Sequence, residues 1–434
     1  MNNNSRVCTR KVIAVMGRST RGFEDHLKAG PKKALRFGTG NYVRISTLHF
    51  FTALFIIGSL LCFFIIVGCS YTYISPFSET LIVNNLVRAN RNSHNIRATD
   101  SLSNGCNMFD GRWVKDERNP LYNASQCPFL EPGFDCLANG RKDEEYLKWR
   151  WKPRDCQVPR FDVLAVLEFL RGKRVVFVGD SLGRTQWESM VCMLMSGVKD
   201  KNSVYEVNGN AITKQIRHLV VRFSGFNLSL EFYRLVFLVR PGVSPKLSPK
   251  RVKKVVKLDR MDGISREWID SDILVFNSGH WWTPTKLFDM GRYFEFAGKI
   301  KLGMTIDDAF KIALSTWQLW IEKAVNPNRT RIFFRTFEST HWSTGSRQNC
   351  KVTRLPSPEL KDKKSSAISD AIIHTVYNTS IPIQLLHVTP MGAFRSDAHV
   401  GSWSDNPSVP DCSHWCLPGV PDMWNELLFS FLLS

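Results

Sequence analysis

The chain has 434 residues, a formal net charge of +19 at pH 7 and a hydrophobic fraction of 43%. This length and hydrophobic fraction exclude a disordered chain and are sufficient for one large domain or two smaller ones. The basic charge is typical of proteins that bind nucleic acid, an anionic membrane or an acidic ligand, and the eleven cysteines are many for a cytosolic protein.

A long apolar segment lies near the N-terminus. No Lys, Arg, Asp or Glu occurs between Arg44 and Glu79, and residues 50–67 are nearly all apolar. At a rise of about 1.5 Å per residue, this run and its flanks can cross a hydrocarbon core of about 30 Å. A buried core helix is the alternative, but the segment has no polar face. We therefore expect residues 48–74 to form a single transmembrane helix.

The charge on either side of this segment predicts its orientation. Residues 1–47 contain ten Lys or Arg and two acids, a basic tail that is too long for the charged region of a cleavable signal peptide. By the positive-inside rule, the tail stays in the cytosol and the chain beyond the helix enters the lumen. We expect a single-pass type II membrane protein with a lumenal stem over residues 75–104. The tail then accounts for +8 of the charge and the lumenal side for +11, which could attract an acidic glycan or a phosphate-bearing donor.

Eight cysteines follow the stem, an even number in a compartment that we expect to be oxidising. They predict four disulfides, although the sequence alone leaves their pairing open. Four N-x-S/T sequons in the same part of the chain are predicted glycosylation sites: Asn123, Asn227, Asn328 and Asn378.

The lumenal part divides into two regions. Residues 105–160 hold four cysteines and many aromatic and turn residues, and so short a block needs disulfides or a neighbour to be stable. Residues 161–434 alternate short apolar runs with amphipathic stretches. Helices are predicted over residues 161–172, 184–195, 306–325 and 365–378, and strands over residues 174–179, 228–239, 272–277, 331–336 and 383–388. This alternation predicts an α/β domain with a mostly parallel sheet between helices.

The tetrapeptide Gly179-Asp180-Ser181-Leu182 follows one of these predicted strands and opens a helix. Open α/β sheets place their ligand sites at such a junction. A Ser there exposes its hydroxyl, and its N–H lies near the positive end of the helix, where it can stabilise an oxyanion. The alternative is a simple helix N-cap, since Asp and Ser are both favoured caps.

A second motif, Asp411-Cys412-Ser413-His414, lies near the C-terminus. An Asp three residues before a His can orient the imidazole and leave its other nitrogen to accept a proton. A capping Asp and an ordinary loop His are the alternative for this motif alone. Together, the two motifs supply a nucleophile, an orienting carboxylate and a base in the order Ser181, Asp411, His414.

With these motifs the chain resembles the SGNH (GDSL-type) hydrolases and acyltransferases, and more specifically the plant trichome birefringence-like polysaccharide O-acetyltransferases. The resemblance runs from about Cys106 to the C-terminus. It is carried, in order, by FDGRWV (109–114), PLY (120–122), CPF (127–129), NGR (139–141), YLKWRWKP (146–153), VPRF (158–161), GDSL with QWES (179–189), FNSGHWW (276–282), RTFESTHW (335–342) and DCSHWCLPGVPDMWNELL (411–428).

The resemblance implies a fold and a location. The fold is an SGNH-like, doubly wound, mostly parallel sheet flanked by helices, with a small disulfide-rich N-terminal subdomain (105–160), a catalytic domain (161–434) and one N-terminal transmembrane helix. The implied location is the Golgi membrane, with the catalytic domain in the lumen. The implied disulfides are Cys106–Cys156, Cys127–Cys192, Cys136–Cys416 and Cys350–Cys412.

The resemblance also implies the roles of the motif residues: Ser181 is the nucleophile, His414 the general base and Asp411 its partner. One position departs from the family pattern, because many members read GDSL-x-R-N-Q where this chain has Thr185. The departure weakens any oxyanion or helix-start role of that side chain and leaves the triad unchanged.

Further side chains are candidates for binding. The oxyanion candidates are the backbone of Ser181 and the side chain of Asn277, which ends a predicted strand; a plain turn role is the alternative for Asn277. The substrate-lining candidates are Arg184, His280, Trp281, Trp282 and His341. Core packing is the alternative for His280 and the two tryptophans, and a structural role is the alternative for His341.

We expect the protein to transfer acetyl groups, through an acetyl-serine intermediate, onto hydroxyls of a plant cell-wall polysaccharide of the xylan, mannan or pectin class. No bound cofactor is expected, and the acetyl donor, such as acetyl-CoA, is a co-substrate. A polysaccharide acetylesterase and a non-catalytic, pectin-binding bridging protein are the alternatives. The sequence has no Cys/His zinc spacing and no nucleic-acid-binding module, so neither a metal nor nucleic acid is expected, and the oligomeric state is left open.

Overall fold

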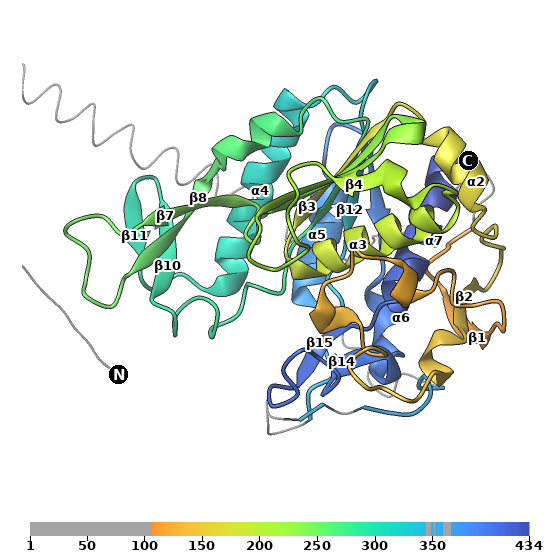
Figure 1. Cartoon of the computed structure of the whole chain (residues 1–434). Helices are drawn as coiled ribbons and strands as arrows, with labels where there is room; N and C mark the ends of the chain where they lie inside the picture. The colour runs from red at the N-terminus through yellow and green to blue at the C-terminus, as the bar shows by residue number, and fades with distance from the viewer. Residues whose placement is uncertain (1–105, 344–348, 351, 359–365, 434) are drawn as a thin grey trace, which may run out of the picture. The chain divides into compact units, whose positions relative to one another are not determined.

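The computed structural model describes residues 106–343, 349–350, 352–358 and 366–433 (Figure 1). The predicted cytosolic tail (1–47), transmembrane helix (48–74) and stem (75–104) lie outside these residues. Within the part of the chain that is described, no helix is both long and apolar enough to cross a membrane.

The described part is built on a seven-stranded sheet with strand order β13-β12-β9-β3-β6-β5-β4. Its strands are β3 (Arg174–Gly179), β4 (Val204–Glu206), β5 (His218–Phe223), β6 (Leu228–Arg234), β9 (Ile273–Asn277), β12 (Arg331–Arg335) and β13 (Ile383–Leu386). The five strands from β13 to β6 are parallel, whereas β5 and β4 add antiparallel pairs at one edge. The predicted α/β fold is confirmed, with a sheet that is mixed rather than wholly parallel.

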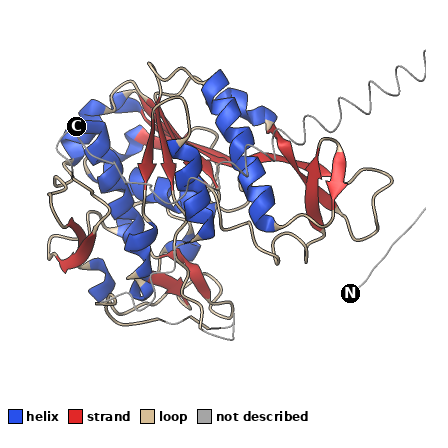
Figure 2. Ribbon diagram, turned by 180° about the vertical axis from the view of Figure 1, so that it is seen from behind, coloured by secondary structure: helices blue, strands red, loops and turns tan. Residues whose placement is uncertain are grey.

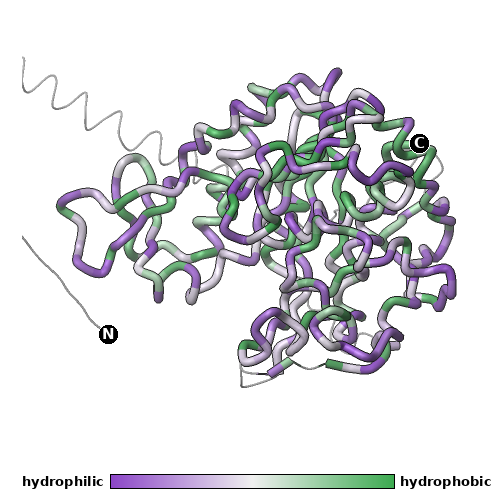
Figure 3. Tube along the Cα trace, in the orientation of Figure 1, coloured by the Kyte–Doolittle hydropathy of each residue, from purple (hydrophilic) through white to green (hydrophobic). Residues whose placement is uncertain are grey.

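Helices cover both faces of this sheet, because successive residues of its strands point to opposite sides. Val175 and Phe177 of β3 pack into one hydrophobic core with α2 (Val163–Phe169), α3 (Ser181–Ser196) and α7 (Val420–Leu433). Val176 and Val178 pack into a second core with α4 (Ile306–Ala324) and α5 (Ala367–Tyr377). Figure 2 shows the helices on the two sides of the strands, and Figure 3 shows the hydrophobic residues concentrated along them.

A second sheet lies beside the first (Figure 1). Its order is β11-β10-β8-β7, formed by β7 (Val239–Val243), β8 (Lys254–Met261), β10 (Arg292–Phe296) and β11 (Lys299–Lys301). The predicted strand 228–239 is therefore wrong in extent. The chain leaves the seven-stranded sheet after Arg234, and Leu238 has a left-handed backbone (φ 62°) before β7 begins.

The N-terminal subdomain contains one antiparallel pair, β1 (Gly111–Lys115) with β2 (Trp149–Pro153). The remaining elements of the described chain are short: α6 (Thr389–Ala393), β14 (His399–Gly401), β15 (Asp411–Trp415), and 3₁₀ turns at Ala124–Gln126, Pro132–Phe134, Glu145–Leu147, Lys201–Ser203, Ser224–Phe226, Gly263–Glu267 and Ser396–Ala398. The buried aromatic residues of the subdomain belong to the same hydrophobic core as α3 and α7. The subdomain thus packs on the catalytic domain, as its short length requires.

Among the described residues, four disulfides form, with the pairing that the resemblance implies: Cys106–Cys156, Cys127–Cys192, Cys136–Cys416 and Cys350–Cys412. The first closes the subdomain on itself. The second fastens the subdomain to α3, and the third fastens it to the chain just after β15. The subdomain is therefore covalently tied to both segments that carry the predicted catalytic residues.

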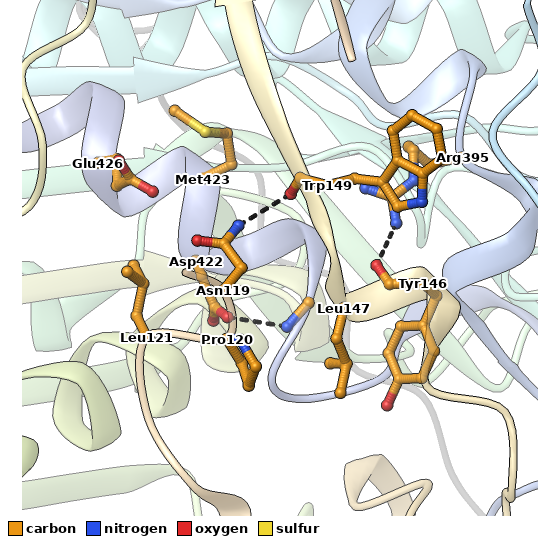
Figure 4. Close-up of a pocket in the computed structure, with 11 residues that line it drawn as sticks. Asn119, Pro120, Leu121, Tyr146, Leu147, Trp149, Arg395, Asp422, Met423 and Glu426 are labelled. Carbon is orange, nitrogen blue, oxygen red and sulfur yellow. Dashed lines mark hydrogen bonds between the residues drawn. The ribbon is translucent and has the colours of Figure 1, made fainter. Parts of the chain in front are cut away.

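Buried polar groups also join the subdomain to the catalytic domain. The Asp422 carboxylate of α7 accepts hydrogen bonds from Ser189 Oγ (2.7 Å) and Tyr122 Oη (3.4 Å). A small cavity of about 10 Å³, enough for one water molecule, lies at the same junction (Figure 4). It is lined by Asn119, Pro120, Leu121, Tyr146, Leu147, Trp149, Arg395, Gly419, Asp422, Met423 and Glu426. A cavity of this size is a gap in the packing between the two regions and is too small to hold a sugar or an acetyl donor.

The fully buried Glu188 of α3 accepts a hydrogen bond from Glu131 N of the subdomain (2.9 Å). Burial raises the pKa of the Glu188 carboxyl to about 8, against the opposing charge of Arg184. The folded protein therefore holds a proton that the unfolded chain releases above its ordinary pKa of 4.5. Because the folded state binds the extra proton, this group makes the free energy of unfolding fall as the pH rises between these two values.

We expect Glu188→Gln, which keeps an acceptor but cannot ionise, to make the free energy of unfolding less dependent on pH. In the unsubstituted protein, Glu188 lowers the free energy of unfolding by at most about 1.4 kcal/mol for each pH unit, and the substitution should abolish this contribution. Denaturant unfolding of both proteins at about pH 5 and about pH 8 measures it. The same pH dependence in both proteins would contradict the assignment of a buried, protonated Glu188.

Candidate active site

Ser181 is the first residue of α3, directly after the end of β3. The helix cap is Asp180, whose Oδ1 accepts a hydrogen bond from Leu182 N (3.0 Å). Ser181 is therefore not used as the cap. Its side chain is partly exposed, and within the described residues its backbone N–H has no hydrogen-bond acceptor. An unpaired N–H at a helix N-terminus can stabilise a negative oxygen.

The structure brings Ser181 together with Asp411 and His414, which lie 230 and 233 residues further along the chain. His414 Nε2 lies 2.6 Å from Ser181 Oγ, and His414 Nδ1 lies 2.6 Å from Asp411 Oδ2. A carboxylate only accepts hydrogen bonds, so Nδ1 carries the hydrogen and Nε2 accepts from the serine hydroxyl. This is the hydrogen-bond pattern of a serine nucleophile with its general base.

The Asp411 carboxylate is held in its charged form. Its Oδ1 accepts hydrogen bonds from the backbone N–H groups of Ser413 (3.0 Å) and His414 (2.9 Å). Burial acts to raise the pKa of Asp411, but the His414 charge and these hydrogen bonds outweigh it and hold the pKa well below its usual range. The carboxylate is therefore ionised at neutral pH and can stabilise a positive imidazole ring beside it.

The segment that carries the base is fixed from several sides. Cys412 and Cys416 lie on either side of His414 and are both in disulfides. The ring of Phe134, from the subdomain, stacks on the His414 ring with centroids 5.2 Å apart. His399 Nδ1 donates to the backbone oxygen of His414 (2.9 Å). The imidazole is thus positioned by both regions of the protein.

His341 extends this support. Its Nδ1 lies 2.7 Å from His399 Nε2, and its Nε2 lies 3.1 Å from Ala393 O. The hydrogen-bonded series runs from His414 O through His399 and His341 to Ala393 O, and both carbonyl oxygens can only accept. His399 therefore donates from Nδ1, and His341 donates from both nitrogens when all three bonds form. Burial lowers the pKa of His399 to about 3, so His399 stays neutral. Both nitrogens of His341 are used inside the protein, which gives it a positioning role.

Asn277 lies at the carboxyl end of β9, next to the end of β3. Its Nδ2 donates to Asp180 Oδ1 (2.7 Å), which leaves one amide N–H. A Cβ atom at Gly179 or Gly183 would overlap Asn277 Oδ1, so only glycine at these positions leaves room for the amide. The Asn277 side chain therefore explains why glycine occupies both positions 179 and 183.

Two of the predicted substrate-lining residues are buried, and those predictions are wrong. Trp282 is 3% exposed and packs in the core under the loop, with its indole N–H donating to Ser278 Oγ (3.1 Å). Arg184 is also 3% exposed; it forms an ion pair with Glu131 and lies 3.6 Å from the Glu188 carboxyl, between the subdomain and α3.

His280 and Trp281 lie at the edge of the site. His280 N donates to Asp180 Oδ2 (3.3 Å), and its Nε2 lies 2.9 Å from Glu338 Oε2. Burial lowers the pKa of His280 to about 4, so the ring is neutral at physiological pH. Trp281 is partly exposed and packs against the second hydrophobic core.

Sequence reasoning did not find Phe134, His399 or Glu338. Their contacts with the triad or with His280 come from other segments of the chain. Glu338 lies in the RTFESTHW motif, but that motif alone does not show that the carboxylate meets His280. The described residues also contain no group of three or more His, Cys, Asp or Glu side chains that could hold a metal ion.

A Ser–His–Asp arrangement at the carboxyl edge of an α/β sheet defines an enzyme of acyl transfer or acyl-ester hydrolysis. Residues 158–431 match the GDSL/SGNH-like acyl-esterase family found in Pmr5 and Cas1p, and residues 104–157 match the PMR5 N-terminal domain. The chain is 54% identical to trichome birefringence-like 7 of Arabidopsis thaliana, over 88% of this chain and 85% of that protein. It is 40% identical to trichome birefringence-like 9 of the same plant, over 78% and 86% of the two chains. The chain belongs to the trichome birefringence-like family.

We expect Gly183→Ala to displace the Asn277 amide, because the new Cβ would occupy its place. The substitution should lower the midpoint of thermal unfolding and reduce acyl-ester turnover, since it disturbs the Asp180 hydrogen bonds beside Ser181. Gly225→Ala is the matched control, because nothing lies within 4 Å of a Cβ at that position. Equal unfolding midpoints and activities for the two variants would contradict the assigned contact.

Proposed function

We propose that the protein transfers an acetyl group from a soluble donor to a hydroxyl of a plant cell-wall polysaccharide. The observation that carries the proposal is the hydrogen-bonded series Ser181, His414, Asp411, with 2.6 Å at both steps. The acyl-esterase family match supports the acyl chemistry. The resemblance to polysaccharide O-acetyltransferases supports the acceptor class.

In the first half of the reaction, Ser181 Oγ attacks the acetyl carbonyl carbon while His414 Nε2 takes the hydroxyl proton. The carbonyl oxygen becomes negative beside the unpaired Ser181 N–H and the remaining N–H of Asn277. When the intermediate collapses, the bond to the donor breaks and the leaving group takes the proton from His414. With acetyl-CoA as the donor, the leaving group is the thiol of CoA, and Ser181 carries the acetyl group.

The second half repeats these steps with the sugar. A sugar hydroxyl gives its proton to His414 Nε2 and attacks the acetyl carbon, and Ser181 then recovers the proton as the ester bond breaks. The protein's own side chains perform every proton transfer. Xylan, mannan and pectin all carry hydroxyls that this chemistry can acetylate.

The hydrolytic alternative uses the same residues, with water in place of the sugar hydroxyl. It is favoured by the family description, which names an acyl-esterase. The non-catalytic bridging protein is disfavoured, because all three triad side chains are present and hydrogen-bonded.

We further propose that the protein is a single-pass type II Golgi membrane protein with residues 105–434 in the lumen. Four disulfides and the exposure of the four sequon asparagines are consistent with a lumenal location. Two measurements on plant membranes test this topology: the shift in gel mobility after endoglycosidase treatment, and the protection of residues 105–434 from added protease in sealed vesicles. An unchanged mobility together with digestion of residues 105–434 would refute the topology.

We expect the full-length protein to acetylate at least one member of a panel of deacetylated xylan, mannan and pectin oligosaccharides. Ser181→Ala should lower the rate by at least about a thousandfold, because it removes the nucleophile. Product analysis by NMR gives the acceptor and the position of the acetyl group. Transfer that persists in Ser181→Ala would refute the mechanism, and hydrolysis of acetylated oligosaccharides that outpaces transfer would favour the esterase.

A further inference from the structure

Three cations surround Trp281 beside the triad. The centre of the Trp281 ring lies 5.2 Å from Arg234 Cζ, 5.2 Å from Lys286 Nζ and 5.8 Å from Arg292 Cζ. Phe237 meets the same ring edge-on at 6.0 Å and holds it in place. We call Arg234, Trp281, Lys286 and Arg292 the Trp281 cluster. It combines a partly exposed tryptophan with positive charge.

The cluster lies next to Ser181. Arg234 ends β6 and is the register partner of Gly179, and Leu235 N donates to Gly179 O (2.8 Å). Trp281 directly follows His280, whose backbone N–H binds Asp180. Both contacts reach the short segment that carries the nucleophile, so a ligand on the cluster would lie beside the reacting hydroxyl.

Three positive side chains lie close together in the cluster. None of its three cations forms an ion pair with a carboxylate among the described residues, although Arg292 Nη1 donates to Lys286 O (2.6 Å). Burial and the neighbouring Arg217 lower the pKa of Arg234, against the opposing charge of Asp180, and burial and Arg234 lower the pKa of Arg292. Like charges held close together repel, and a bound anion would relieve that repulsion.

The positive surface continues onto the four-stranded sheet. Arg292 of β10 is the register partner of Lys254 of β8, and Lys253 N donates to Gly291 O (2.8 Å). From residue 239 to 261 the chain has eight Lys or Arg and one Asp. Among these cations, only Lys257 forms an ion pair with a described carboxylate, that of Glu295. A small donor could contact one end of this surface, whereas a linear polyanion could contact all of it.

We propose that the Trp281 cluster binds an acidic sugar unit of the acceptor polysaccharide. The sugar carboxylate pairs with Arg234 and Arg292, the sugar ring contacts the exposed part of Trp281, and further acidic units contact the four-stranded sheet. The inference rests on the proposed acetyl transfer and narrows its acceptor to a uronate-containing polysaccharide. The phosphates of CoA are also negatively charged, so the experiment must distinguish binding of the acidic sugar from binding of CoA.

The test measures binding by calorimetry in full-length Ser181→Ala, which cannot turn over. The ligands are an oligogalacturonate, a neutral xylo-oligosaccharide and CoA. Adding Arg234→Gln or Arg292→Gln should weaken oligogalacturonate binding about tenfold, the effect of one lost charged contact, and leave CoA binding unchanged. Lys199→Gln is the matched control, since Lys199 is exposed and lies beyond the opposite end of α3.

Unchanged oligogalacturonate binding in both cluster variants, with the thermal midpoint preserved, would overturn the proposal. Weakened binding of CoA alone would also overturn it, because the cluster would then hold the donor. Since binding is measured without turnover, these binding results remain interpretable even if the acetyl-transfer assay fails. The two proposals can therefore fail separately.

Discussion

The buried carboxylate of Asp180 is the constraint on which the site depends. It is fully buried and accepts hydrogen bonds from Leu182 N (3.0 Å), Asn277 Nδ2 (2.7 Å) and His280 N (3.3 Å). A buried charge without such partners costs several kcal/mol, about as much as a small domain's margin of stability. The ends of β3 and β9 and the start of α3 are therefore held in one arrangement, and that arrangement presents the Ser181 hydroxyl and N–H together.

The other half of the site is positioned by the N-terminal subdomain. Disulfides hold the chain on both sides of His414, and Phe134 of the subdomain stacks on its ring. The subdomain shares its hydrophobic core with α3 and α7, and it is joined to them by buried polar contacts. Its function in this account is to fix the general base against the nucleophile, which needs accuracy within a fraction of an ångström.

Sequence patterns predicted the parts that depend on local chemistry. The Ser181 and His414 motifs could be found because each lies in a short segment whose residue types match its task. Burial depends on distant segments, so the sequence left Trp282 open between a substrate-lining and a core position, and the structure places it in the core. Helix α7 was not predicted because it is buried nearly all round and lacks amphipathic periodicity. The start of α3 at Ser181 rather than residue 184 depends on the cap at Asp180, whose role the motif left open.

The central claim is that Ser181 carries the acetyl group between donor and sugar. Its most direct test is peptide mass spectrometry of the full-length protein, quenched shortly after mixing with an acetyl donor in the absence of acceptor. The account predicts one acetyl group on Ser181 that disappears when an acceptor oligosaccharide is added. Formation of acetylated polysaccharide by a protein whose Ser181 is never acetylated, or an acetyl group carried on a different side chain, would contradict it.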